Sequence, residues 1–151
     1  EEMPCVSPVG YAADSKSLTD RLFRRVAGSD TRKPWRELFF TGEGASALSP
    51  VEAGPYAEAL ENVRLAPSAS NKQPWRIVRH EDRQAFTFYL SPAFGYRRIK
   101  KIALQEIDLG IAMSHFDLTV KELGLQGTWL QENDARVIES WDYIATWQAA
   151  D

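Results

Sequence analysis

The sequence predicts an α+β fold in which an antiparallel or mixed sheet packs on one long central helix. Residues 75–81 and 85–90 alternate apolar and polar side chains around a turn at 82–84, which is the pattern of a β-hairpin. Residues 99–123 carry apolar side chains at helical spacing in two stripes, and such a helix is expected to be buried on two sides. The hairpin and the long helix together predict a sheet with a helix packed across it.

Length and charge limit the possible functions. The chain has 151 residues, a formal net charge of −3, and 44% hydrophobic and 26% charged residues, values typical of one globular domain or slightly more. So small a charge offers no field to attract nucleic acid or an anionic membrane. The single cysteine, Cys5, excludes an internal disulfide and is typical of a reducing compartment. We therefore expect a cytoplasmic protein without a nucleic-acid or membrane partner.

The first predicted helix covers about residues 16–26. Its apolar face has the helical spacing of Leu18, Leu22, Phe23 and Val26. Gly28 is expected to end this helix, and Pro34 suits the first turn of a second, short one. Three arginines, Arg21, Arg24 and Arg25, are interpreted as a solvated face, so the first helix should bury only its apolar side.

Residues 41–47 formally fit Gly-x-Gly-x-x-Ala, the relaxed dinucleotide-binding fingerprint. That motif must open a helix whose N-terminus holds the pyrophosphate. Pro50, Gly54 and Pro55 prevent a helix of useful length here, so the fingerprint is rejected. We interpret the segment as a linker and expect it to divide the chain into residues 1–47 and 48–151.

A helix and a polar loop follow the linker. Residues 56–65 have an inner stripe formed by Tyr56, Ala59, Leu60 and Val63. Pro67 cannot continue the helix because it lacks an amide hydrogen and restricts the residue before it. The loop that follows is dense in donors and acceptors, namely Ser68, Ser70, Asn71 and Gln73. It can hold a flat heterocycle by its polar edge or be a well-tied turn, and spacing alone leaves both open.

The C-terminal third completes the predicted sheet. Arg97, Arg98, Lys100 and Lys101 form a basic cluster that we interpret as a solvated loop. Gly124 should end the long helix, and residues 127–131 and 143–147 should form strands. Trp141 and Trp147 provide apolar bulk that is expected to pack against the long helix.

The sequence contains no self-sufficient catalytic set. His80 is expected to be exposed in the hairpin, and His115 to be a hydrogen-bonded interior residue of the long helix. Cys5 has no nearby histidine or helix start to make it a thiolate, and no spacing of histidine, cysteine and carboxylate indicates a metal site. This pattern is typical of an enzyme in which a cofactor carries the reactivity.

Two segments resemble one family. Arg64-x-Ala-Pro-Ser-x-x-Asn-x-Gln-Pro-Trp75 resembles the signature loop of FMN-dependent nitroreductases. The segment 108–116, Asp-Leu-Gly-Ile-Ala-Met-Ser-His-Phe, resembles the two-half (Thermotoga-type) group, in which one polypeptide carries two nitroreductase-like halves. The resemblance implies a nitroreductase-like fold, with residues 1–47 as the tail of a first half and residues 48–151 as the second half of a pseudo-dimer.

The resemblance also implies FMN as cofactor. Pro8 to Tyr11 would lie along the flavin ring, Arg32 and Lys33 would neutralise the phosphate, and Ser68, Ser70 and Asn71 would contact the polar edge of the ring. Pro67 and Pro74 would stiffen the loop. The implied cofactor-binding set is Pro8, Val9, Gly10, Tyr11, Arg32, Lys33, Pro67, Ser68, Ala69, Ser70, Asn71 and Gln73.

The implied activity is transfer of hydride from NADH or NADPH through the flavin to a nitroaromatic, quinone or similar acceptor. The implied macromolecular partner is an upstream nitroreductase-like half, in the same polypeptide or as a separate chain, or a second copy in a homodimer. The Arg-x-Ser-x-Arg phosphate motif of nitroreductases is absent from this sequence. Its absence keeps an alternative open. In that alternative the chain is a non-catalytic module that binds flavin or another ligand, or interacts with a partner, and that has lost its site or shares it.

Overall fold

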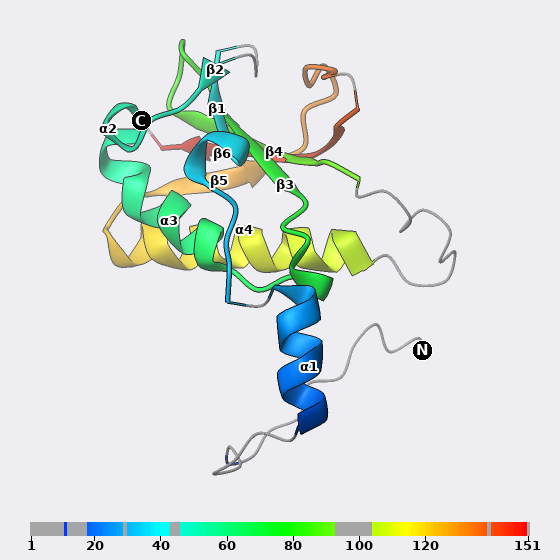
Figure 1. The fold of residues 1–151 in the computed structure, drawn as a ribbon. Coiled ribbons are helices and arrows are strands. Elements are labelled where there is room, and N and C mark those ends of the chain that lie inside the picture. The colour runs from blue at the N-terminus through cyan, green and yellow to red at the C-terminus, as the bar shows by residue number, and fades with distance from the viewer. Residues whose placement is uncertain are drawn as a thin grey trace, which may run out of the picture.

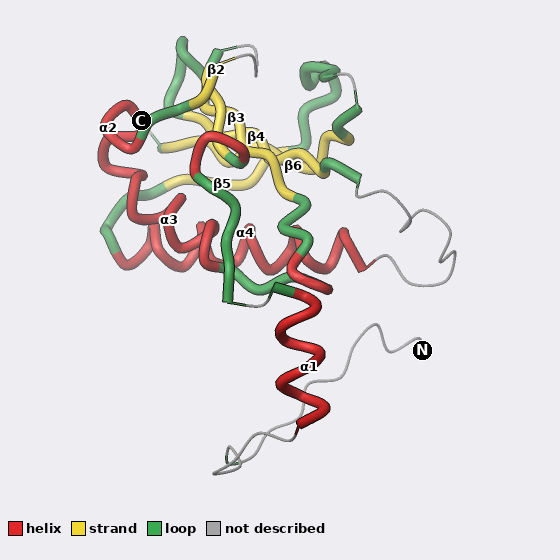
Figure 2. Tube along the Cα trace, in the orientation of Figure 1, coloured by secondary structure: helices red, strands yellow, loops and turns green. Residues whose placement is uncertain are grey.

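The protein is built from one sheet and a layer of helices on one of its faces (Figure 1). The computed structural model describes residues 11, 18–28, 30–42, 46–92, 104–138 and 140–150. The helices gather on one side of the strands, whereas loop segments cover the other side (Figure 2). This arrangement confirms the predicted α+β class at the level of a mixed sheet packed on helices.

The sheet has six strands in the order β2-β1-β3-β4-β6-β5. The strands are β1 (Phe39–Thr41), β2 (Ser46–Ala47), β3 (Trp75–Arg79), β4 (Ala85–Leu90), β5 (Gly127–Leu130) and β6 (Asp142–Ala149). The pair β1–β3 is parallel and the other four neighbouring pairs are antiparallel. The predicted hairpin is the antiparallel pair β3–β4, which forms the middle of the sheet.

The helices differ in how they contact the sheet. The α-helices are α1 (Leu18–Ala27), α2 (Pro50–Ala53), α3 (Ala57–Leu65) and α4 (Leu104–Glu122), and the 3-10 helices are η1 (Trp35–Glu37), η2 (Gly54–Tyr56) and η3 (Ala69–Asn71). α4 runs across the sheet beside α3, whereas α1 projects away from the body (Figure 1). Among the described residues, no helix is long and apolar enough to cross a membrane.

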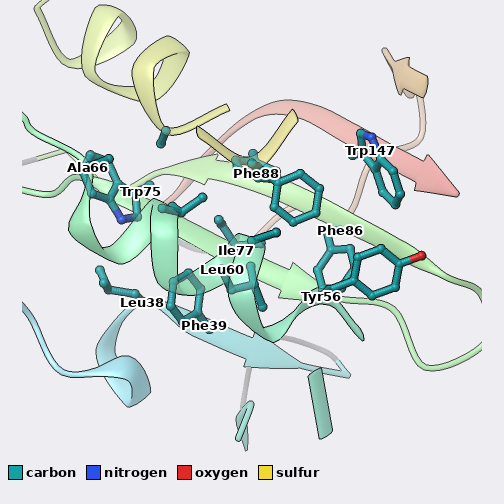
Figure 3. Packing of buried hydrophobic residues seen from close by; sticks show 14 of the residues in the cluster. Leu38, Phe39, Tyr56, Leu60, Ala66, Trp75, Ile77, Phe86, Phe88 and Trp147 are labelled. Carbon is teal, nitrogen blue, oxygen red and sulfur yellow. The ribbon is translucent and has the colours of Figure 1, made fainter. Parts of the chain in front are cut away.

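The core lies between the sheet and the helices α3 and α4 (Figure 3). The predicted inner stripe of α3 is buried, as is the stripe of α4 that contains Leu109, Phe116 and Val120. The ring of Phe116 lies edge-on to Trp147, with their centroids 5.4 Å apart. The prediction that Trp147 packs against the long helix is therefore confirmed.

Residues from the segment between β5 and β6 lie against the opposite face of the sheet. Tyr89 donates its hydroxyl to the carbonyl oxygen of Arg136 at 3.1 Å, and Thr87 is hydrogen-bonded to Thr146 at 2.9 Å. The ring of Trp141 packs against Phe40, with their centroids 5.0 Å apart. The prediction that Trp141 packs against the long helix is wrong. Simple alternation would place Trp141 on the same face as Trp147, but the β4–β6 pair has a register shift between Phe88 and Tyr89. This shift reverses the alternation, so Trp141 packs with Phe40 and Tyr89 on the far face.

The residues on either side of the predicted linker belong to neighbouring strands of the sheet. β1 pairs with β2 through Phe40 and Ala47, and the flanking Leu38 and Leu48 are both buried in the core. The prediction that no long helix follows is confirmed, since α2 ends at Ala53 and Gly54 adopts a left-handed φ of 58°. The division into two halves at this point stays a prediction.

Two apolar stripes expected to be buried have exposed residues. On α1, Leu18, Leu22 and Val26 are 83%, 62% and 79% exposed. On α4, the other predicted stripe consists of Leu104, Ile107, Ile111 and Leu118. Its first three residues are half-buried and Leu118 is 68% exposed. The predicted burial of α4 on two sides is therefore incomplete in this chain.

Candidate functional site

The loop between α3 and β3 has an unusual backbone. Ser70, Asn71 and Gln73 adopt φ angles of 49°, 53° and 46°. A left-handed conformation is uncommon for residues other than glycine and costs on the order of 1–2 kcal/mol for each. The surrounding contacts must therefore hold the loop in this shape, and such strain tends to cluster at functional sites.

Gln73 is the centre of these contacts and is only 3% exposed. Its Oε1 accepts a hydrogen bond from the backbone N–H of Lys33 at 2.8 Å, and its Nε2 donates to Oδ1 of Asn71 at 3.0 Å. Its backbone N–H donates to Oγ of Ser68 at 2.9 Å. One buried side chain thus closes the loop on itself and joins it to residue 33.

Asn71 ties the same loop to the end of α1. Its Nδ2 donates to the carbonyl oxygens of Gly28 and Thr31 at 2.6 Å and 2.9 Å. Its Oδ1 accepts from Nη1 of Arg32 at 3.4 Å, and Nε of Arg32 donates to the carbonyl of Leu65 at 3.2 Å. Segments about 40 residues apart are therefore joined by a continuous set of hydrogen bonds.

Two cations converge on one carbonyl oxygen of the loop. Nζ of Lys33 and Nη1 of Arg76 donate to the carbonyl of Gln73 at 3.4 Å and 3.2 Å. Burial lowers the pKa of Lys33, and the positive charge of Arg76 lowers it further, against the opposing effect of Glu37. Burial also lowers the pKa of Arg76. Neither cation forms an ion pair with a described carboxylate within 4.0 Å, so this corner holds excess positive charge.

A buried carboxylate on α4 holds the loop from the other side. Asp108 is 4% exposed, and its Oδ1 accepts the backbone N–H of Ala69 at 2.8 Å. Its Oδ2 is buried without a hydrogen-bond partner among the described residues. Burial raises the pKa of Asp108, and the bond from Ala69 partly opposes this rise. The carboxylate therefore links the loop to the helix that spans the sheet.

The structure brings part of the predicted set together. Arg32, Lys33, Ser68, Ala69, Asn71 and Gln73 belong to the hydrogen-bonded cluster, with Pro74 buried beside it and Pro67 and Ser70 at its exposed edge. Tyr11 is fully exposed. Pro8, Val9 and Gly10 lie outside the described residues, as does the basic cluster at 97–101.

Sequence analysis missed Arg76 and Asp108. Arg76 occupies a polar position of an alternating strand, and that pattern predicts a solvated side chain. In the structure its Nη1 donates to the carbonyl oxygens of Trp75 and of the left-handed Gln73. Asp108 had a visible signal, because it is spaced i, i+4, i+8 with Ala112 and Phe116 on the buried face of the long helix. A carboxylate in such a stripe is uncommon unless it has a partner.

Neither histidine is placed as predicted. His80 is half-buried, and its Nε2 is hydrogen-bonded to Oγ1 of Thr87 at 2.8 Å. Burial, with Arg83 adding to it, lowers the pKa of His80. His115 lies half-buried on the outer side of α4 instead of in the interior. In the described part of the chain, no group of histidine, cysteine and carboxylate residues could hold a metal ion.

Comparison with known proteins identifies a family. A family model described as "Putative TM nitroreductase" matches residues 1–120, which include α1, the signature loop and most of α4. No curated protein and no solved structure matches the chain. Since the family match covers most of the 151 residues, the chain belongs to this nitroreductase family.

Proposed function

We propose that the protein is an FMN-dependent oxidoreductase that passes hydride from NADH or NADPH through the flavin to a nitroaromatic, quinone or similar acceptor. The observation that carries the proposal is the joining of residues 32–33 to the 68–73 loop by hydrogen bonds. These are the two described segments that the family resemblance assigns to FMN, and the chain belongs to a nitroreductase family. The family membership supports oxidoreductase activity, and the cluster supports the place of the cofactor.

The donor set fits an anionic flavin nucleotide. Lys33 and Arg76 bring two positive charges to one carbonyl oxygen without a carboxylate in ion-pair contact, so an incoming phosphate would meet little competition. The guanidinium of Arg76 can offer two parallel N–H donors, which match the geometry of phosphate oxygens. We propose that these two residues bind the phosphate.

The other residues of the loop have two proposed roles, bracing the loop and contacting the flavin ring. The amide groups of Asn71 and Gln73 already have protein partners, so in this conformation they brace the loop. Ser68 accepts from the backbone of Gln73, and its own hydroxyl hydrogen can still donate to a ring carbonyl. Asp108 fixes Ala69, and the exposed Ser70 follows at the loop edge. Ser68 and Ser70 are thus the proposed contacts to the ring, on a loop that is shaped before binding.

The bound flavin would supply the redox chemistry by accepting hydride and passing on electrons. The chain would supply binding and electrostatics. Lys33 and Arg76 would hold negative charge near the loop, and the braced backbone would fix the orientation of the ring without large rearrangement. This division explains why the chain needs no nucleophile or metal of its own.

Purification followed by enzymology tests the proposal. The protein should bind FMN with quenching of flavin fluorescence, and the complex should oxidise NADH or NADPH when a quinone or nitroaromatic is added. Lys33→Gln and Arg76→Gln should weaken FMN binding by about tenfold or more, the loss expected for one charge-assisted hydrogen bond. The matched control Lys121→Gln, an exposed residue paired with Asp117, should leave it unchanged.

Repeating the FMN-binding measurement with an added upstream nitroreductase-like half distinguishes a shared site from a lost one. If FMN binds only in its presence, the site is shared between the halves. If the chain takes up no FMN with or without that half, the oxidoreductase proposal fails and a non-catalytic module is favoured. If FMN binds but no NAD(P)H is oxidised with any acceptor, the chain is a flavin-binding module and the proposed activity is wrong.

A further inference from the structure

Five side chains form a closed ring of hydrogen bonds, called here the polar ring, on the face of the sheet opposite the helices. Nε2 of His80 is bonded to Oγ1 of Thr87 at 2.8 Å, and Oγ1 of Thr87 is bonded to Oγ1 of Thr146 at 2.9 Å. Thr146 donates to Oε2 of Glu132 at 3.0 Å. Nη2 of Arg83 donates to Oε1 of Glu132 at 2.6 Å, and Nε of Arg83 donates to Nδ1 of His80 at 3.3 Å, which closes the ring.

The polar ring joins four neighbouring strands. His80 comes directly after β3, and Thr87 lies on β4. Thr146 lies on β6, and Glu132 follows the end of β5, so the ring crosses these strands in their order in the sheet. Arg83 comes from the turn between β3 and β4. The ring therefore ties this turn to the start of the β5–β6 segment, defined as residues 131–138 and 140–141.

The chemistry of the two charged members fixes the position of each hydrogen in the polar ring. A guanidinium can only donate, so Nδ1 of His80 accepts, and a neutral imidazole then carries its hydrogen on Nε2. A carboxylate can only accept, so the single hydroxyl hydrogen of Thr146 points to Glu132 and that of Thr87 points to Thr146. Thr87 is thereby left to accept from Nε2 of His80, in agreement with the first assignment. All five bonds are satisfied together when His80 is neutral and Glu132 is ionised.

A proton on Nδ1 of His80 is incompatible with this arrangement. It removes the acceptor of the Nε–H of Arg83 and brings two cations within 3.3 Å of each other. The opposing charges are Glu132, from the β5–β6 segment, and Asp82, whose Oδ1 lies 3.9 Å from Nδ1. The Asp82 side chain is 84% exposed, so water screens its attraction. Protonation therefore opens the ring at the contact between His80 and Arg83.

The two titratable members of the polar ring respond to different pH ranges. Burial and then Arg83 lower the pKa of His80, and this outweighs the opposite effects of Glu132 and Asp82. Burial raises the pKa of Glu132, but the hydrogen bonds from Arg83 and Thr146 outweigh it and lower that pKa overall. Between pH 7 and pH 5 the histidine is thus the group that takes up a proton. The closed ring is favoured above the released histidine's pKa of about 6.5 and is disfavoured as the pH falls below it.

Glu132 helps to hold the β5–β6 segment on the sheet. Its side chain makes two bonds of the polar ring, and its backbone N–H donates to the hydroxyl of Tyr143 at 2.8 Å. Further along the segment, the carbonyl oxygen of Arg136 accepts from the hydroxyl of Tyr89. The segment, orange in Figure 1, lies on the side of the sheet away from α4. Opening of the ring would therefore free the start of this segment and uncover Tyr89.

The same side chains do not form a hydrolytic site. Thr87, His80 and Asp82 have the order of a nucleophile, a base and a carboxylate. However, Thr87 is only 2% exposed, so a substrate cannot reach its hydroxyl. Nδ1 of His80 accepts a hydrogen bond from Arg83, so it has no hydrogen to donate to Asp82. A conformational role fits this geometry better than a catalytic one.

We propose that the polar ring is an acid-sensitive latch, in which protonation of His80 breaks the contact with Arg83 and releases the β5–β6 segment from the far face of the sheet. The latch is closed while His80 is neutral and Glu132 is ionised. The proposal does not depend on flavin binding, because none of the five side chains belongs to the candidate flavin site.

Nuclear magnetic resonance of the wild-type chain gives the first test. At pH 7.5 the ¹⁵N shifts of His80 should show a neutral imidazole with its hydrogen on Nε2 and a bare Nδ1. A hydrogen on Nδ1 at this pH would overturn the proposal, because Arg83 would then have no acceptor there. The measurement needs no substitution, so it does not depend on the folding of any variant.

Hydrogen exchange followed by mass spectrometry tests the release itself. After correction for the intrinsic pH dependence of exchange, the protection of residues 131–138 in the wild-type chain should fall by about tenfold from pH 7 to pH 5, since a released histidine with a pKa of about 6.5 takes up a proton over this range. The protection of β3 should not fall. Unchanged protection of residues 131–138, or an equal loss in β3 through global unfolding, would overturn the proposal.

The two histidines of the chain provide a variant and its matched control. His80→Gln, which has no group to titrate at this position, should abolish the change in protection of residues 131–138 between pH 7 and pH 5. His115→Gln, on the outer side of α4, should retain the change of about tenfold. A change that persists in His80→Gln, or that disappears in His115→Gln, would contradict the assignment of the latch to His80.

Discussion

The aromatic core and the 68–73 loop are stabilised by opposite kinds of interaction. In the core, Phe116 is fully buried and its ring lies within 6.2 Å of Phe86, Phe88, Trp129 and Trp147, centroid to centroid. In the loop, three left-handed residues other than glycine are held by amide and hydroxyl hydrogen bonds. The core is stabilised by burial of apolar area, which does not depend on direction. The loop is stabilised by a few hydrogen bonds, which require a fixed geometry. Substitutions should therefore affect the two regions differently.

The largest expected effect is in the core. Phe116→Ala should lower the free energy of unfolding by about 3–5 kcal/mol, because it removes a buried ring and leaves a cavity among the other aromatic rings. Urea unfolding followed by circular dichroism measures this loss. Val137→Ala, at a 90% exposed residue, is the control and should change stability by less than about 0.5 kcal/mol. Equal effects for the two variants would show that the core is not where the fold places it.

The next effect is in the loop. Gln73→Ala should lower the free energy of unfolding by about 1–3 kcal/mol, because it leaves the half-buried N–H of Lys33 without its acceptor and removes a hydrogen bond to Asn71. Hydrogen exchange of the Lys33 amide should become faster. Lys72→Ala, at the exposed neighbouring residue, should leave that exchange rate unchanged. An unchanged rate in Gln73→Ala would contradict the bracing role of this amide.

A smaller effect is expected from Ser68→Ala. The substitution removes a single acceptor, the Oγ that receives the backbone N–H of Gln73 at 2.9 Å, and should cost about 0.5–1.5 kcal/mol. Ser46→Ala, in the exposed strand β2, is the matched control. A loss as large as that of Gln73→Ala would show that Ser68, and not Gln73, is the main brace.

The contact between the two regions should depend on pH. Because burial raises the pKa of Asp108 in the folded state, the folded protein binds a proton there that the unfolded chain has already lost. As the pH rises, ionisation of Asp108 therefore lowers the stability of the folded protein. The loss begins above the unfolded pKa of about 3.9 and is complete above the raised folded pKa. Asp108→Asn has no such titration. The free energy of unfolding of the variant minus that of the wild type should therefore be lowest at pH 4 and should rise with pH. A difference that stays constant between pH 4 and pH 8 would contradict this assignment.

The comparison also explains which features were predictable from the sequence. The stripe of α3 and the hairpin β3–β4 follow from local apolar spacing, and both were predicted correctly. Strand β1 was missed because it has three residues and is recognised only by its parallel partner β3, more than 30 residues later. The face on which Trp141 packs depends on the register shift in the β4–β6 pair, which apolar spacing along the chain does not reveal.

The site was less predictable than the fold. The signature residues were found by resemblance, but their bonds were not, because no propensity predicts a left-handed φ at Ser70, Asn71 and Gln73 in one loop. The convergence of Lys33 and Arg76 on one carbonyl oxygen depends on this geometry. The sequence motif therefore locates the loop, whereas the hydrogen bonds of its side chains are known only from the structure.

The most direct test of the proposed flavin site compares the affinities of the chain for FMN and for riboflavin, which lacks the phosphate. If Lys33 and Arg76 bind the phosphate, FMN should bind about tenfold or more tightly than riboflavin, as expected for one charge-assisted contact. Arg76→Gln should reduce this preference and leave riboflavin affinity unchanged. Equal affinity of the wild-type chain for the two flavins, or a preference that persists in Arg76→Gln, would contradict the assignment of the phosphate to this cation pair.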